Sequence, residues 1–182
     1  MNTSIGIAFF TTPVGVCGVA WSERGLTAVQ LPEASTTATR ARFRARCPDA
    51  VEVEPPADVQ RAIDDIGELL RSGRTDLRSV VLDYSQVGEF ERRAYEIARG
   101  ILPGATSTYG EIAAALGDPH AARAVGQAMG HNPYPIVVPC HRVLAADGRL
   151  GGFSAGGGVE TKLRLLRIEG AEAARQGSLF DR

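Results

Sequence analysis

Strand-like segments come first in this chain, and helices with clear start and stop signals come after them. Apolar, β-branched runs lie at residues 5–11, 16–22 and 26–31, and turn signals at 12–15 and 23–25 separate them. These runs predict an antiparallel meander. In the second half, apolar side chains recur at helical spacing between capping residues. Strands followed by helices, rather than alternating with them, predict an α+β fold.

Two helices are predicted within the first half. A short one is expected around residues 37–46. For the second, Asp58 can serve as the cap and Gly73 as the stop. Its apolar positions have helical spacing, at Val59, Ile63, Ile66 and Leu70. Residues 80–84 are expected to form a further strand or an extended linker.

The second half predicts several short helices. The first has an apolar face between residues 90 and 101 and should end at Pro103. Thr108 and Glu111 have the spacing of a capping box, in which each side chain bonds the backbone of the other. The helix that they start should stop at Gly117.

The next helix follows at once, since Asp118 can cap it and Pro119 suits its first position. Two short capped helices joined by a tight turn make a helix-turn-helix candidate. In the second helix Arg123 is surrounded by small residues, namely Ala121, Ala122, Ala124, Gly126 and Ala128. Small side chains allow a close neighbour, which is either another helix or a DNA groove. This pattern alone favours plain core packing over DNA binding.

The remaining segments complete a helical second domain. We expect a buried strand at residues 136–138 and a hairpin that pairs 143–144 with 149–150. A glycine-rich loop should follow at residues 151–158, and a last helix at 159–169. We therefore expect three parts. Residues 1–85 should form a small supporting α+β domain with an antiparallel sheet, since no chemical motif lies there. Residues 86–170 should form a helical, winged-helix-like domain, and residues 171–182 a loose tail.

Composition narrows the class of protein. The 182 residues carry a net charge of -1, which does not suit a generic nucleic-acid binder. Residues 1–89 carry net -3 and residues 90–182 net +2, so a polyanion should meet the second half. No apolar run approaches a membrane span, and the N-terminus does not resemble a signal peptide. Three irregularly spaced cysteines favour a reducing cytoplasm over a disulfide framework, and no metal-binding motif appears.

The dipeptide Cys140-His141 is the main candidate for chemistry. A thiol becomes a good nucleophile only when deprotonated, and a nearby imidazole can take its proton. Adjacent residues of an extended chain point to opposite sides, so the two side chains need a bend or a bridging water to communicate. A lone buried cysteine is most often an inert small hydrophobe, and the dipeptide alone favours that interpretation.

Further blocks of sequence change this balance. The string Pro139-Cys140-His141-Arg142-Val143 is accompanied by blocks at residues 108–113, 121–126, 132–133, 152–154 and 162–169. In their order and spacing they resemble the O6-alkylguanine-DNA alkyltransferase family, also called methylated-DNA–protein-cysteine methyltransferases. The resemblance covers residues 90–170 closely and the first half only in outline.

The resemblance implies stoichiometric, irreversible transfer of an alkyl group from O6-alkylguanine, and also from O4-alkylthymine, to Cys140. His141 would act as the base through a water, and Glu169 would orient it. Asn132 would brace the active-site turn, and Tyr109 would donate a proton or hydrogen bond to the departing guanine. The protein is expected to act as a monomer without a cofactor. No metal is expected either, because the first half has no evident set of cysteines and histidines for zinc.

The resemblance also implies how double-stranded DNA is bound. Arg123 would enter the minor groove and fill the gap that the flipped base leaves, with Ala122 and Ala124 allowing close approach. Val143 and the loop at Ser154 would hold the base edge through backbone groups. The remaining contacts with substrate or DNA would come from Met129 and Phe153 as pocket walls and from Pro135 and Arg142. Phe153 stands where many members have Tyr, so that position lacks a hydroxyl.

Three other functions stay open. A lesion sensor of the same fold would bind alkylated DNA and leave Cys140 unmodified. A cysteine hydrolase would turn over acyl or peptide substrates, but no oxyanion-hole motif appears. A winged-helix regulator would bind a specific sequence and would be indifferent to Cys140→Ser.

Overall fold

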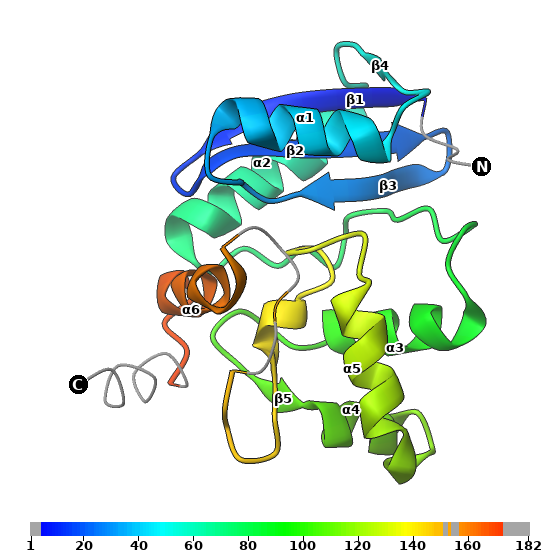
Figure 1. Ribbon diagram of the computed structural model, residues 1–182, viewed down its shortest axis with the longest axis vertical. Coiled ribbons are helices and arrows are strands. Elements are labelled where there is room, and N and C mark those ends of the chain that lie inside the picture. The colour runs from blue at the N-terminus through cyan, green and yellow to red at the C-terminus, as the bar shows by residue number, and fades with distance from the viewer. Residues whose placement is uncertain (1–4, 151–152, 154–156, 173–182) are drawn as a thin grey trace.

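The computed structural model describes residues 5–150, 153 and 157–172 (Figure 1). A four-stranded sheet, ordered β3-β2-β1-β4, forms one end of the molecule. The strands β1 (Gly6–Thr12), β2 (Gly15–Ser22) and β3 (Gly25–Gln30) pair in antiparallel fashion, which confirms the predicted meander. The short β4 (Val51–Glu52) adds to β1 in parallel.

Two helices cover opposite faces of this sheet, α1 (Thr36–Arg46) and α2 (Ala57–Ser72) (Figure 1). The alternation of side chains along β2 explains the arrangement. Ala20 points into a small cluster with Phe43 of α1, whereas Val19 joins the large cluster that includes Val59 of α2.

The boundaries of α2 differ from the prediction at one end. The helix begins at Ala57, so Pro56 holds the N-cap position and Asp58 lies in the first turn. A carboxylate there still interacts favourably with the positive end of the helix dipole. At the other end Gly73, with φ 71°, closes the helix in the left-handed conformation as predicted.

The second half is mainly helical. Its elements are α3 (Glu89–Arg99), β5 (Ser107–Thr108), α4 (Tyr109–Ala115), the 3-10 turn η1 (Pro119–Ala121), α5 (Ala122–Gly130), the 3-10 turn η2 (Cys140–Arg142), β6 (Val143–Leu144) and α6 (Gly158–Ile168). The capping box forms, since Thr108 N donates to Glu111 Oε2 at 2.7 Å and Glu111 N to Thr108 Oγ1 at 3.1 Å. Asp118 caps η1, and α5 then continues from it.

Two local predictions need correction. Residues 136–138 form a tight turn and not a strand, because Ile136 adopts φ 77° and Val138 N bonds back to Tyr134 O at 2.8 Å. The strand β6 pairs in parallel with β5, so the expected partner at 149–150 is replaced, and the turn is closed by Ala145 N to Arg149 O at 3.0 Å. Residues 80–84, predicted as a strand or an extended linker, form an extended linker with one bridge, Leu26 to Leu82.

One apolar core runs through both halves of the chain. The cluster that holds Val19 and Val59 also contains Val125 of α5, Cys140 and Leu165 of α6. Among the described helices, none is long and apolar enough to cross a membrane. Most of the glycine-rich loop at 151–158 and the tail beyond Glu172 lie outside the described residues.

Candidate active site around Cys140

Cys140 is the first residue of η2 and lies two residues after the tight turn at 136–138. The Asn132 side chain joins the two ends of that turn, since its Nδ2 donates to Val138 O and its Oδ1 accepts from Tyr134 N, both at 2.9 Å. The Cys140 backbone N–H bonds Val138 O at 2.8 Å. Asn132 therefore ties the two ends of the turn together, and this turn holds the backbone that leads to Cys140.

The Cys140 thiol is buried, with 6% of the residue exposed. Burial raises its pKa, whereas a hydrogen bond from the Asn132 side chain and the positive charge of Lys162 lower it. A raised pKa keeps the thiol protonated at neutral pH. The nucleophile therefore depends on a base that removes the proton.

His141 follows Cys140 in the same 3-10 turn, so the backbone is bent and not extended between the two residues. Its Nε2 lies 2.8 Å from Glu169 Oε1, and burial lowers the pKa of the imidazole although Glu169 opposes this. A neutral imidazole that donates from Nε2 carries its lone pair on Nδ1. That Nδ1 is buried and has no hydrogen-bond partner among the described residues, so it is the atom that can accept a proton.

Glu169 follows the last residue of α6 and is held by several donors. Arg142 donates two hydrogen bonds to this carboxylate, from Nε to Oε2 at 2.9 Å and from Nη2 to Oε1 at 2.8 Å. The backbone N–H of Gly104 approaches Oε2 at 3.5 Å. Burial alone would raise the pKa of Glu169, but His141 and Arg142 together lower it to about 2. The group is therefore a carboxylate at neutral pH.

Arg142 is a correction to the sequence analysis, which placed it among the residues that contact substrate or DNA. The residue is 5% exposed, and its Nη1 donates to Ile101 O at 2.5 Å while the rest of the guanidinium binds Glu169. Its charge is satisfied inside the protein, so it holds the carboxylate in place. Nothing in the local sequence indicates a partner 27 positions away.

Lys162 is a residue that the sequence analysis did not assign a role. It is fully buried, at 0% exposure, and its Nζ donates to Val143 O at 2.7 Å. Burial lowers its pKa to about 8, and Cys140 opposes this shift. The sequence did contain a signal for its burial. Lys162 precedes Leu165 by three residues and Leu166 by four, which places it on the apolar face of α6.

The main-chain groups of Val143 are already engaged. Its N–H bonds Cys140 O, and its carbonyl accepts the Lys162 hydrogen bond. The expected contact with a base edge therefore depends on the second lone pair of that carbonyl.

Tyr109 is the first residue of α4, and its ring lies against α5. A Cβ built on Gly126 would lie 3.9 Å from Tyr109 Cδ1, which is van der Waals distance, so the ring lies beside this position of α5. Burial raises the pKa of Tyr109, and Cys140 raises it further, which keeps the phenol protonated. Tyr109 is therefore able to donate a proton or a hydrogen bond near the thiol.

The predicted DNA-facing residues lie on α5. Arg123 is exposed, and its neighbours Ala122 and Ala124 are partly buried. Met129 is 3% exposed and belongs to the apolar core. Ser154 lies outside the described residues, so its predicted contact is not placed.

Cys140 opens into a cavity of about 210 Å³. Pro135, Asn132 and Phe153 line one part of it, and residues of the first half line the other part. These are Val29, Gln30 and Leu31 at the end of β3, together with Arg42 and Arg46 of α1. The first half was predicted to take no part in the site, because only tertiary packing brings α1 to Cys140.

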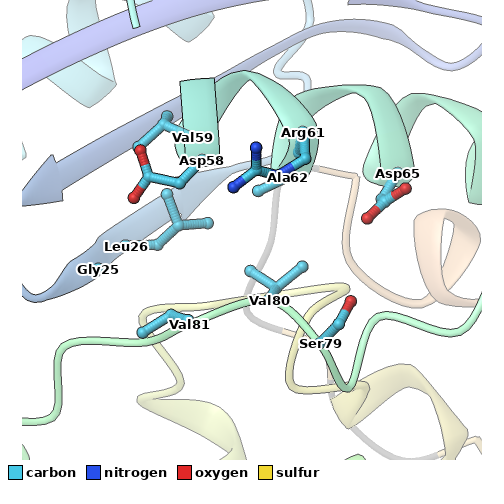
Figure 2. Close-up of a pocket in the computed structure, with 10 residues that line it drawn as sticks. All are labelled: Gly25, Leu26, Asp58, Val59, Arg61, Ala62, Asp65, Ser79, Val80 and Val81. Atoms are coloured by element: carbon cyan, nitrogen blue, oxygen red, sulfur yellow. The ribbon is translucent and has the colours of Figure 1, made fainter. Parts of the chain in front are cut away.

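A second, larger cavity of about 330 Å³ lies elsewhere, between α2 and the extended linker (Figure 2). Asp58, Arg61 and Asp65 of α2 stand along one side, and Leu26 and Val80 lie across from them. The described residues that line it include no cysteine or histidine, so they offer no thiol and no imidazole base. Among the described residues, no cluster of histidine, cysteine and acidic side chains could hold a metal ion.

Comparisons with known proteins agree with this geometry. The sequence pattern described as "6-O-methylguanine DNA methyltransferase, DNA binding domain" matches residues 89–171. The chain is 36% identical over 170 residues to a methylated-DNA–protein-cysteine methyltransferase of Mycobacterium tuberculosis, covering 93% of this chain and 95% of that protein. A protein of the same name from Methanothermobacter thermautotrophicus is 34% identical over 87% of this chain and 82% of its own length.

Solved structures show the same likeness. That of the Mycobacterium tuberculosis OGT in complex with DNA has a TM-score of 0.69 and 32% identity, covering 97% of this chain and 100% of that one. The O6-methylguanine-DNA methyltransferase of Pyrococcus kodakaraensis strain KOD1 has a TM-score of 0.71 and 31% identity, covering 91% and 99%. These likenesses extend over both halves of the chain, including the sheet.

Proposed function

Because the chain belongs to the methylated-DNA–protein-cysteine methyltransferase family, we propose that it repairs DNA directly, with Cys140 as the acceptor of the alkyl group. The lesion is O6-alkylguanine, and O4-alkylthymine is a second substrate. The observation that carries the proposal is the arrangement at η2, where a buried thiol precedes an imidazole that a carboxylate holds at 2.8 Å.

The first step is removal of the thiol proton. His141 Nδ1 accepts it through a bridging water, because Nε2 is committed to Glu169. The imidazolium that forms is stabilised by the carboxylate, which Arg142 keeps in place. Lys162 adds a positive charge that favours the thiolate.

The second step is an in-line displacement. The thiolate sulfur forms a bond to the alkyl carbon, and the bond from that carbon to O6 of guanine breaks. The electron pair leaves with guanine, and Tyr109 donates the proton or hydrogen bond that stabilises the departing base. If Tyr109 gives up its proton, the proton held by His141 restores the phenol; if Tyr109 donates only a hydrogen bond, the proton from His141 neutralises the guanine anion. The thioether is stable, so each protein molecule repairs one lesion.

DNA is bound through the second half of the chain. Residues 86–170 contact the duplex, and residues 1–85 support them. The target base must leave the stack to reach a buried thiol. Arg123, exposed on α5, fills the gap from the minor groove, and the small side chains beside it permit the close approach. The degenerate code of that groove suits repair without sequence preference.

The protein acts as a monomer without a cofactor, in the cytoplasm. The three cysteines are unpaired, which suits a reducing compartment.

The test is the intact mass of the protein after it is mixed with a duplex that contains one O6-methylguanine. We expect a stoichiometric gain of one methyl group that maps to Cys140 and is absent in Cys140→Ser. An unchanged mass with tight lesion binding would indicate a sensor instead. Repeated turnover of an ester would indicate a hydrolase, and tight binding of one undamaged sequence would indicate a regulator.

A further inference from the structure

The cavity at Cys140 has a positively charged wall that the transfer of a methyl group does not require. Arg42 and Arg46 of α1 line it together with Gln30. Arg46 Nη1 lies 3.2 Å from Gln30 Oε1 and 3.3 Å from Val29 O. Arg42 pairs with Glu33 at 3.3 Å, although its side chain stays 54% exposed. Two guanidinium groups and one carboxylate leave a net positive charge at this wall.

The geometry of the displacement decides which part of a substrate reaches this wall. Sulfur, carbon and the departing O6 must lie nearly in line. The other substituents of the alkyl carbon therefore project sideways from that line. Pro135 and Phe153, which were expected to contact the substrate, line the cavity, whereas Tyr109 and Met129 do not. With the base against Pro135 and Phe153, a long substituent on the alkyl carbon extends toward the wall that the first half supplies.

The cavity is larger than a methyl group needs. A water molecule occupies about 30 Å³ of liquid volume, so about 210 Å³ corresponds to roughly seven waters. Pro135 and Phe153 provide apolar surface near the thiol, and the arginines lie on the wall that the first half supplies. This arrangement suits a short alkyl group that is apolar near the reacting carbon and negatively charged at its end.

We infer that the Arg42–Arg46 wall selects O6-alkylguanines whose alkyl group ends in an anion, such as O6-carboxymethylguanine. This inference rests on the proposed function, since it concerns the substrate class of the same site. A carboxylate there would accept charge-assisted hydrogen bonds from the guanidinium groups. The transfer itself is unchanged. The sulfur forms a bond to the methylene carbon, the bond to O6 breaks, and Cys140 becomes S-carboxymethylated.

The test compares two adducts of nearly equal shape and different charge. Duplexes carry O6-carboxymethylguanine, or its neutral carbamoylmethyl analogue, and the second-order rate of Cys140 modification is measured by mass. Within each protein the ratio of the two rates cancels any general loss of activity. We expect Arg42→Gln and Arg46→Gln each to lower this ratio about fivefold, as the loss of a charge pair of about 1 kcal/mol would do.

Two further variants serve as controls for effects other than the loss of charge at the wall. Arg44→Gln changes the same helix where its guanidinium pairs with Glu52, and we expect the ratio to stay at the wild-type value. Arg46→Lys keeps the charge and should restore most of the ratio, even if Arg46→Gln weakens the packing around Phe43.

A duplex that contains O6-methylguanine tests the proposed function separately from the inference about the charged wall. Methyl transfer together with the same ratio in wild type, Arg42→Gln and Arg46→Gln would overturn the charged-wall inference alone. Absence of methyl transfer in the wild type would overturn the proposed function, and the inference with it.

Discussion

Glu169 holds the imidazole of His141 through Nε2, at 2.8 Å, and so leaves Nδ1 as the atom that can receive a proton. The carboxylate comes from the end of α6 and the imidazole from η2, 28 positions earlier. The same oxygen, Oε1, also accepts from Arg142 Nη2 at 2.8 Å. The tautomer of the base is therefore fixed by a buried ion pair, and this arrangement can be tested piece by piece.

Replacing Glu169 with Gln should slow the transfer. The amide keeps the shape but cannot stabilise the imidazolium, so we expect the rate of Cys140 methylation to fall at least about tenfold. Glu172→Gln is the matched control, since Glu172 is exposed three residues later. Equal methylation rates in the two variants would argue against a role for the carboxylate.

Removing Arg142 should destabilise the fold more than removing both members of the ion pair. Arg142→Met leaves Glu169 charged and buried, which costs about 3–5 kcal/mol in comparable pairs. The double variant Arg142→Met with Glu169→Leu should recover part of this loss. Free energies of unfolding in urea provide the measurement. A double variant less stable than Arg142→Met would show that the pair is not coupled in this way.

Lys162 should lower the thiol pKa of Cys140. Its cation favours the thiolate, so Lys162→Met should move the titration of the thiol to higher pH. The pH dependence of Cys140 alkylation by iodoacetamide reports this shift directly. Lys162→Arg should titrate close to the wild type. Arg167→Met, an exposed cation on the same helix, serves as the control, and a shift of the same size there would rule out a specific effect.

Stability should fall in a defined acidic window. The pKa of Glu169 is about 2 in the folded protein, below its ordinary value of 4.5. A depressed folded pKa adds stability that is fully present above the unfolded value, so it should be lost between about pH 4.5 and pH 2. The stability advantage of the wild type over Glu169→Gln should therefore shrink across this window in urea unfolding. An advantage independent of pH would contradict it.

Arg123→Ala should impair repair of duplex DNA but not reaction with the free base. Without the guanidinium the gap beside the flipped base stays unfilled, so methyl transfer from a duplex should slow about tenfold or more. Modification of Cys140 by free O6-methylguanine should proceed at the wild-type rate. Gln127→Ala, exposed one turn further along α5, is the control. An equal loss with both substrates would place the effect on folding.

Local signals in the sequence predicted the parts of the fold that depend on near neighbours. The capping box of Thr108 and Glu111 forms as expected, and Gly73 and Gly117 adopt positive φ at helix ends. The turn at residues 136–138 was missed because three β-branched residues favour a strand, and the bonds that Asn132 makes across the turn override that preference.

Contacts between segments far apart in the sequence could not be predicted from such local signals. The burial of Arg142 depends on Glu169 and Ile101, and no local pattern links these positions. The approach of Arg42 and Arg46 to Cys140 depends on how α1 packs on the sheet. Cys140, His141, Asn132 and Glu169 were named from the resemblance, and their geometry supports those roles.

The continuous core has a consequence for how defects in this protein would appear. Side chains of the sheet, such as Val19, share one apolar cluster with Cys140 and with Val125 of the DNA-facing helix. Such a cluster tends to unfold in a single cooperative transition. A cavity made in the sheet, for instance by Val19→Ala, would therefore lower the fraction of molecules with a reactive thiol. Although Val19 lies in the sheet and not at the DNA-binding helix, cells that carry such a substitution would be more sensitive to alkylating agents.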